Sequence, residues 1–320
     1  MTSPTKFKSV LVSVVVVMMA GLAAVRGTAQ EPVADVLIRG GMIYPGNAAP
    51  FRGDVAIRGD RIVYVGPKAP GGAKTVIDAA GLIVAPGFID PHTHSDAALA
   101  SSDPTARLVL PFLMQGVTTA FVGVDGHGDP DIARVLGRSA AEGIGINYAA
   151  YVGFGGVRRQ VIGEADRVPS AAELAQMTGL VSDAMCQGAL GLSTGLFYAP
   201  QSFAKTGEVV ALARAAAAKG GVYDTHPRDE STYTVGLKGS IEEALTIGRE
   251  AGIPVHIAHI KALGVDVHGQ APTVIAMIEA AQRAGQVVHA DQYPWSASHT
   301  SLAAALIPRW AQDGGRAALL

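Results

Sequence analysis

The amino-acid sequence predicts an α/β fold in which strands and helices alternate along the chain. From residue 84 onward, short runs rich in β-branched and aromatic residues are separated by helical segments. Two of these segments open on a serine with a glutamate three residues later, Ser170 with Glu173 and Ser240 with Glu243, which is the pattern of a capping box. Strands that alternate with capped helices indicate repeated βα units and a parallel sheet.

Residues 1–29 have the three-part pattern of a secretory signal peptide. Lys6 and Lys8 precede an apolar run from Val10 to Val25, and small residues follow it, as they do before a cleavage site. The run is shorter than the roughly 20 apolar residues of a spanning helix. We therefore expect cleavage rather than a permanent membrane anchor, and an exported protein that is periplasmic or secreted.

Residues 32–83 predict a small β module. Runs such as "VLIRGGMIY" and "DVAIRGDRIVYVG" alternate between apolar and polar residues, and Gly-Gly, Gly-Asp and Pro-Gly signals separate them, as is typical of strands joined by turns. So few strands are too small to close a core alone. We expect this partial β-sandwich to need strands from elsewhere.

Residues 84–320 predict seven strands of a barrel. The strand runs are "GFIDPHTH", "TTAFVGVDG", "INYAAYVGFG", "GALGLSTG", "GVYDTHPR", "PVHIAHIK" and "VVHADQYPW", and the helices between them end at Gly116, Gly143, Gly188, Gly220, Gly252 and Gly285. A closed barrel of βα units has eight strands. The final segment, "SLAAALIPRWAQDGGRAALL", is helical in pattern, so we expect an incomplete barrel and a sequence that is cut short.

Composition excludes several classes of function. With 49% hydrophobic and 16% charged residues the chain can bury a large core, and its net charge of -2 gives no basic surface for nucleic acid or an anionic membrane. The single cysteine, Cys186, cannot form an internal disulfide. We expect a globular protein that is stabilised by its core alone.

Four histidines stand at corresponding ends of three predicted strands. His92 and His94 are two residues apart and so project to one face, and His226 and His259 occupy the same ends of the fifth and sixth strands. Barrel enzymes place their chemistry at this end, and imidazole nitrogens suit zinc at about 2.0–2.1 Å. The pattern predicts a metal site, with four unrelated core histidines as the alternative.

Several segments resemble a known enzyme family. "PGFIDPHTHSD" resembles the first-strand signature of the amidohydrolase superfamily. The block from Gly188 to Ser231, followed by "PVHIAHIKALG" and "DQYPWSASHTSL", is similar to the N-acyl-D-amino-acid deacylases, or D-aminoacylases. The resemblance implies a metal-dependent (β/α)₈ barrel, a small β-sandwich built from both chain ends, and one or two Zn²⁺ ions.

The resemblance also implies a set of metal ligands. His92 and His94 match the first-strand pair of the family, and His226 and His259 match the histidines that hold its more tightly bound metal. A second-strand cysteine normally adds a further ligand, but Asp125 stands at that position in "GVTTAFVGVDG". Because a carboxylate can bind or bridge zinc, we expect Asp125 to replace the cysteine. The alternative is an ordinary Asp-Gly turn.

Four further positions match residues that contact substrate in the family. Lys261 would polarise the scissile carbonyl or be a solvated lysine, and Tyr198 would contact substrate or serve only in packing. Arg228 would pair with a substrate carboxylate or form a salt bridge with the acidic residues that follow it. Ser298 is a weaker match to a substrate-binding serine.

The implied reaction is hydrolysis of the amide bond of an N-acyl-D-amino acid by zinc-activated water. The family uses an aspartate at the end of the eighth strand as acid and base. No residue matches it, and Asp291 at the end of the seventh strand is expected to be structural. We therefore expect the chain to be a poorly soluble and almost inactive fragment.

Two alternatives remain at this stage. A cyclic-amide hydrolase of the dihydropyrimidinase or dihydroorotase type belongs to the same superfamily, but such enzymes commonly carry a carboxylated lysine on the fourth strand, and "GALGLSTGLFY" has none. The other alternative is a non-catalytic remnant that binds metal or nothing.

Overall fold

The computed structural model describes residues 34–320 and divides after Pro86 into two compact units. The predicted signal peptide lies outside the described residues. The division falls three residues beyond the sequence-based boundary because Ile83 and Val84 form a short strand that still pairs within the first unit. Among the helices of the described chain, none has the length and apolarity needed to cross a membrane.

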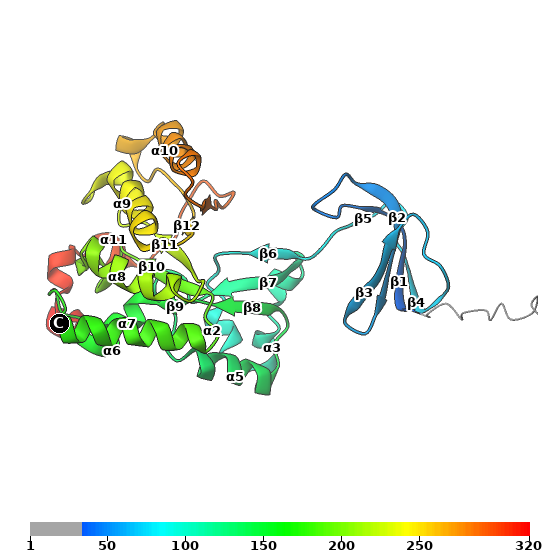
Figure 1. Ribbon diagram of the computed structural model, residues 1–320, viewed down its shortest axis with the longest axis horizontal. Coiled ribbons are helices and arrows are strands. Elements are labelled where there is room, and N and C mark those ends of the chain that lie inside the picture. The colour runs from blue at the N-terminus through cyan, green and yellow to red at the C-terminus, as the bar shows by residue number, and fades with distance from the viewer. Residues whose placement is uncertain (1–33) are drawn as a thin grey trace, which may run out of the picture. The chain divides into compact units, whose positions relative to one another are not determined.

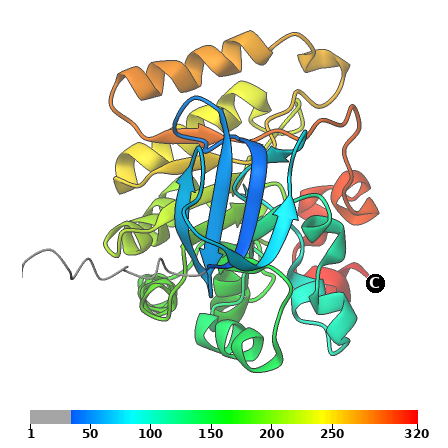
Figure 2. The ribbon, with the colours of Figure 1, turned by 90° about the vertical axis from the view of Figure 1, so that its right-hand side faces the viewer.

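The first unit is a small β-sheet, as the alternating pattern predicts. Its strands are β1 (Ala34–Ile43), β2 (Phe51–Arg58), β3 (Arg61–Gly66), β4 (Ala73–Asp78) and β5 (Ile83–Val84). β1 pairs antiparallel with β2 and parallel with β4 and β5, and β2 pairs antiparallel with β3. Figure 2 shows these strands side by side. Their buried cluster is small, consisting of Ala34, Leu37 and Ala56, whereas Ile62 and Ile77 are exposed.

The second unit contains the seven predicted barrel strands, all pairing in parallel. They are β6 (Phe88–Asp90), β7 (Val117–Val122), β8 (Asn147–Ala150) continued by β9 (Val152–Gly153), β10 (Gly191–Gly195), β11 (Val222–His226), β12 (Val255–Ile257) and β13 (Val288–Ala290). Hydrogen bonding follows chain order, with one interruption at Tyr151 between β8 and β9. Within the described residues β6 and β13 form the two free edges.

Long helices follow the strands and flank the sheet (Figure 1). They are α5 (Ile132–Glu142), α6 (Phe154–Ile162), α7 (Ala171–Cys186), α8 (Thr206–Ala217), α9 (Gly236–Ala251) and α10 (Ala271–Arg283). All six glycines predicted to end helices have positive φ, between 65° and 108°. This left-handed conformation costs glycine little, which is why it stops a helix there.

One of the two predicted capping boxes is present. Ser170 and Glu173 cap α7 reciprocally. The prediction for Ser240 is wrong, because α9 already begins at Gly236 and encloses Ser240. The Ser240 hydroxyl instead accepts a hydrogen bond from the backbone N–H of Asp229 at 2.9 Å.

Short elements fill the connections at the ends of the strands. They are α2 (Asp96–Leu99), α3 (Pro104–Arg107), α4 (Leu110–Leu113), α11 (Leu302–Leu306) and α12 (Gly315–Leu319), with single turns of 3₁₀ helix at Gln201–Phe203, Val265–Val267 and Arg309–Gln312.

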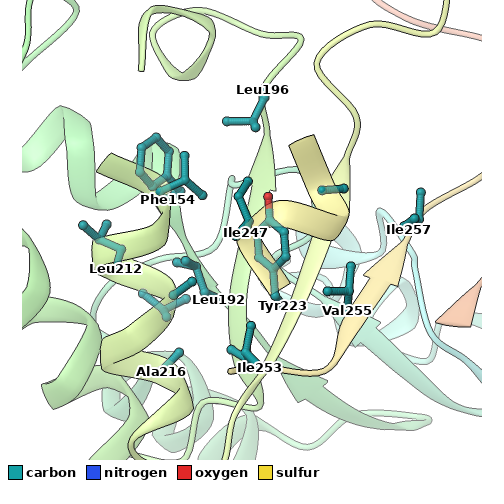
Figure 3. Packing of buried hydrophobic residues seen from close by; sticks show 14 of the residues in the cluster. Phe154, Leu192, Leu196, Leu212, Ala216, Tyr223, Ile247, Ile253, Val255 and Ile257 are labelled. Carbon is teal, nitrogen blue, oxygen red and sulfur yellow. The ribbon is translucent and has the colours of Figure 1, made fainter. Parts of the chain in front are cut away.

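The main core lies between the sheet and its helices. Leu192, Tyr223 and Val255, from three adjacent strands, face α8 and α9, as Figure 3 shows. Each is at most 1% exposed, and burial of one such side chain contributes about 1.5–3 kcal/mol. Because side chains alternate along a strand, the neighbours Ser193 and Asp224 point to the opposite face, into the barrel.

Candidate metal centre

A single carboxylate lies at the centre of the four predicted histidines. Oδ1 of Asp125 is 3.2 Å from Nε2 of His92, 3.7 Å from Nδ1 of His226 and 4.0 Å from Nε2 of His259. Oδ2 of Asp125 is 3.5 Å from Nε2 of His94. The structure therefore brings together every metal ligand that the sequence predicts.

Asp125 is held in a strained conformation by its surroundings. Its φ is 54°, a region that non-glycine residues adopt at a cost unless the structure fixes them there. Gln201 fixes the loop by donating to the carbonyl of Asp125 at 2.8 Å, and Ser193 accepts from the N–H of Gly126 at 3.1 Å. Two residues from the β10 side of the barrel thus aim the carboxylate at the histidines.

His226 reaches the site from the end of β11. Tyr223 points outward into the core, so the alternation of the strand sends Asp224 and His226 inward. The His226 side chain is 7% exposed, and this burial lowers its pKa to about 4. The ring is therefore neutral at pH 7 and able to bind a metal.

His92 and His94 lie on the loop that follows β6. Thr93 between them fixes this loop, since its backbone N–H and its hydroxyl both donate to the carbonyl of Phe121. Nδ1 of His92 lies 3.3 Å from Oδ2 of Asp224. Burial alone would lower the pKa of His92, but the carboxylates of Asp125 and Asp224 outweigh it and raise the pKa to about 10.

His259 lies just beyond β12 and also has a positive φ, 34°. Its backbone N–H donates to the carboxylate of Asp291, whose other oxygen accepts from Nε2 of His256 at 2.7 Å. Asp291 thus holds the backbone of His259 and leaves its ring free to face Asp125, which agrees with the structural role expected from the sequence.

The residues present fit a divalent metal. Nε2 of His92, Oδ1 of Asp125 and both ring nitrogens of His226 are buried without a hydrogen-bond partner, although such groups are normally paired. Ligands of one tetrahedral zinc, each at about 2.0–2.1 Å, lie roughly 3.4 Å apart. The separations around Asp125, from 3.2 to 4.0 Å, are close to that value.

A cavity of about 800 Å³ opens over these ligands. Lys261, Tyr198 and Ser298 line it, as the sequence predicts, together with Glu230 and Tyr293. Nζ of Lys261 donates to Oε1 of Glu230 and lies 2.8 Å from Nδ1 of His259. The Tyr198 ring packs 4.8 Å from that of His226, and burial raises the pKa of its hydroxyl to about 12.

The substrate-binding prediction for Arg228 needs correction. Its guanidinium pairs with Glu243 at 2.7 and 2.9 Å and donates to the carbonyls of Ser202 and Ala204. It is not among the residues that line the cavity. The physical reason is that β11 ends at His226, so the two-residue alternation that aligned Arg228 with His226 no longer applies.

Two carboxylates at the site were not identified from the sequence. Asp224 contacts His92, and Glu230 contacts His259 and Lys261. Asp224 stands two residues before His226 on the same strand, so alternation could have identified it. Glu230 follows in an irregular loop, where no periodicity applies.

Comparisons with known proteins agree with this arrangement. No family model matches the chain. It is 37% identical to a D-aminoacylase of Alcaligenes xylosoxydans xylosoxydans over 292 residues, which are 84% of this chain and 59% of that protein. It is 36% identical to an N-acyl-D-aspartate deacylase of the same organism, over 84% of this chain and 57% of that protein. Over these shares the chain is similar to the N-acyl-D-amino-acid deacylases.

Solved structures of deacylases show the same fold. An N-acyl-D-glutamate deacylase from Bordetella bronchiseptica, complexed with zinc and a phosphonate inhibitor, superposes with a TM-score of 0.77 at 31% identity over 82% of this chain and 59% of that one. A D-aminoacylase structure gives 0.75 at 36% identity over the same shares of the two chains. These likenesses confirm the predicted amidohydrolase barrel class, and the chain spans 59% of these deacylase chains.

Proposed function

We propose that this chain binds a divalent metal, with Zn²⁺ as the first candidate, between Asp125 and the four histidines. We also propose that hydrolysis of N-acyl-D-amino acids takes place over it. The observation that carries the proposal is the cluster itself, in which one buried carboxylate lies within 4.0 Å of a ring nitrogen of each histidine. The preference for D-amino acids is supported by the relatives alone.

When bound, the metal would supply a water molecule whose pKa approaches about 7 and would polarise the amide carbonyl. Asp125 would hold the metal together with the histidines, since its Oδ1 faces His92, His226 and His259 and its Oδ2 faces His94. Asp125 and His259 are the two proposed ligands with positive φ, and this backbone conformation aims their side chains at a common centre. Such preorganisation is what a hydrolytic site requires.

The cavity offers groups for both ends of an N-acyl amino acid. Lys261, Tyr293 and Ser298 are placed to receive a carboxylate, with Nζ of Lys261 5.6 Å from the centre of the Tyr293 ring. Because its pKa is about 12, the Tyr198 hydroxyl stays protonated at neutral pH and can donate to a carbonyl oxygen. These side chains would orient substrate, whereas Arg228 links Glu243 to the carbonyls of Ser202 and Ala204.

Asp125 distinguishes this chain from the family pattern quoted above. A carboxylate oxygen is a harder ligand than a thiolate, so it discriminates less against Mn²⁺ and Co²⁺. We therefore propose that the site accepts these ions as well as zinc.

The signal-peptide pattern of residues 1–29 supports export of the protein. The mass of the mature protein would test whether these residues are removed.

The cyclic-amide alternative is not favoured by the site. The fourth barrel strand, β10, has the sequence "GLSTG", and Lys261, after the sixth strand, is the one lysine among the described residues that line the cavity. Hydantoinase structures resemble this chain at 17–20% identity, a level that speaks for the fold alone.

Metal content and substrate selectivity test the proposal. The full chain is purified, loaded with Zn²⁺, Mn²⁺ or Co²⁺, and analysed for bound metal by mass spectrometry. It is then assayed with N-acetyl-D-methionine, the L-enantiomer and a hydantoin. We expect bound metal and slow turnover that favours the D-enantiomer and is lost on chelation. A chain that binds no metal at micromolar concentration would overturn the proposal. Preference for the hydantoin would show that the chain acts as a cyclic-amide hydrolase instead.

A further inference from the structure

Glu230 lies behind two of the proposed ligands. Its Oε1 is 3.3 Å from Nδ1 of His259, and its Oε2 is 3.9 Å from Nε2 of His226. In each ring this is the nitrogen opposite to the one that faces Asp125. The carboxylate side chain of Glu230 is 6% exposed. Water therefore does not compete with it for contact with these two ring nitrogens.

The proton of a metal-bound imidazole must be on the nitrogen that does not bind the metal. If Nε2 of His259 and Nδ1 of His226 bind, their N–H groups are at Nδ1 and Nε2. Both N–H groups point toward Glu230. The N–H of His259 is within hydrogen-bond distance of the carboxylate, and that of His226 is at ion-pair distance from it. A carboxylate that accepts from a metal-ligating histidine fixes its tautomer and raises its basicity.

We propose that Glu230 is a positioning residue shared by His259 and His226, which directs Nε2 of the former and Nδ1 of the latter at the metal. The inference rests on the proposed metal site. It differs from a second reading of the same cluster, in which Glu230 itself binds a metal with these two histidines, since the three groups lie within 4.8 Å of one another.

The contacts of Lys261 depend on which nitrogen of His259 carries the proton. Its ammonium is 2.8 Å from Nδ1 of His259 and also donates to Glu230. A hydrogen bond from Lys261 to Nδ1 would require the proton of His259 to be on Nε2, where it would block the metal. When Nε2 binds the metal, Nδ1 donates to Oε1 of Glu230, the same oxygen that accepts from Lys261.

The experiment compares Glu230→Gln with Glu208→Gln by equilibrium dialysis with Zn²⁺ and Co²⁺. Glu208 is the matched control, because it is a buried glutamate that pairs with Arg158 outside the cavity. We expect Glu230→Gln to keep the wild-type number of bound ions and to weaken the tighter one by about 10–100-fold. Glu230→Ala should weaken it further, because the amide of glutamine still offers an acceptor, and Glu208→Gln should change neither number nor affinity.

Three results would overturn the inference. Unchanged affinity in Glu230→Gln would show that Glu230 does not act on the metal, and loss of one whole ion would make it a ligand. An equal loss of metal affinity in Glu208→Gln would show that the effect of Glu230→Gln comes from a general loss of stability. If the wild-type chain binds no metal, the proposed function fails first. Should the variants not fold, ¹⁵N NMR of the wild-type histidines decides, with coordination through Nδ1 of His259 as the contrary outcome.

Discussion

The two halves of the site differ in how firmly the fold holds them. His226 and His259 form one half, on β11 and just beyond β12 inside a five-stranded sheet, with Glu230 behind both. His92 and His94 form the other half, on a loop after β6, a three-residue edge strand. The His94 side chain is 64% exposed, whereas those of His92, His226 and His259 are 6%, 7% and 13% exposed.

From this difference we expect two metal affinities in one cavity. Charges interact more strongly away from water, and buried strands open less often than edges and loops. The half formed by His226 and His259 is therefore expected to bind a metal tightly, and the half formed by His92 and His94 to bind one weakly. Asp125 joins the halves, since its Oδ1 faces His226 in one half and His92 in the other.

Replacing the carboxylate that joins the two halves should have the largest effect. In Asp125→Ala both halves lose a ligand, so metal affinity should fall by more than the roughly 100-fold that loss of a supporting residue can produce. Equilibrium dialysis with zinc measures it. Asp129→Ala, in the same loop but paired with Arg134, is the control and should bind as the wild type does. Unchanged metal content in Asp125→Ala would remove it from the ligands.

A comparison of single-histidine variants would test the difference between the halves. His226→Ala should lose the tighter ion, with a fall in affinity of about 100-fold or more, whereas His94→Ala should affect the tighter ion by less than about tenfold. Calorimetric titration with Zn²⁺ separates the two binding events. Equal losses in the two variants would mean that burial does not determine affinity here.

The features that sequence could predict are local ones. The glycines that end helices, the seven strands and the ligands at strand ends follow from turn chemistry and from the two-residue period of a strand. Arg228 shows where this reasoning stops, since it lies beyond the last residue of β11, and its partner Glu243 is one element away on α9. Glu230 likewise acts through the orientation of rings that only the folded chain brings together.

Asp224→Asn would test whether a buried carboxylate also positions His92, in the half of the site at the sheet edge. The Asp224 side chain is fully buried and faces Nδ1 of His92, in the same relation that Glu230 has to His259. We expect affinity for the weaker ion to fall by about tenfold, with the tighter ion little changed. Dialysis at saturating and at limiting Co²⁺ distinguishes the two ions. A loss confined to the tighter ion would contradict the division into halves.

The smallest effect on metal is expected from Asp229→Asn, which tests what makes the loop after β11 rigid. The Asp229 carboxylate accepts hydrogen bonds from the N–H groups of Ser231, Thr234 and Gly236. Burial would raise the pKa of Asp229, but these bonds outweigh it and lower the pKa from its usual value. The ionised form is thus more favourable in the folded chain than in the unfolded chain.

A carboxyl whose pKa is lowered by folding adds stability above its unfolded pKa, and this stability disappears as the pH falls through the folded value. In the metal-free chain Asp229→Asn should therefore lower the free energy of unfolding by about 2 kcal/mol at pH 7, and the difference from wild type should shrink below about pH 4. Urea melts at pH 7, 5 and 3.5 measure it, with exposed Asp266→Asn as control. A difference that stays constant with pH would mean that hydrogen-bond geometry, rather than charge, holds Glu230 and its loop behind the two histidines.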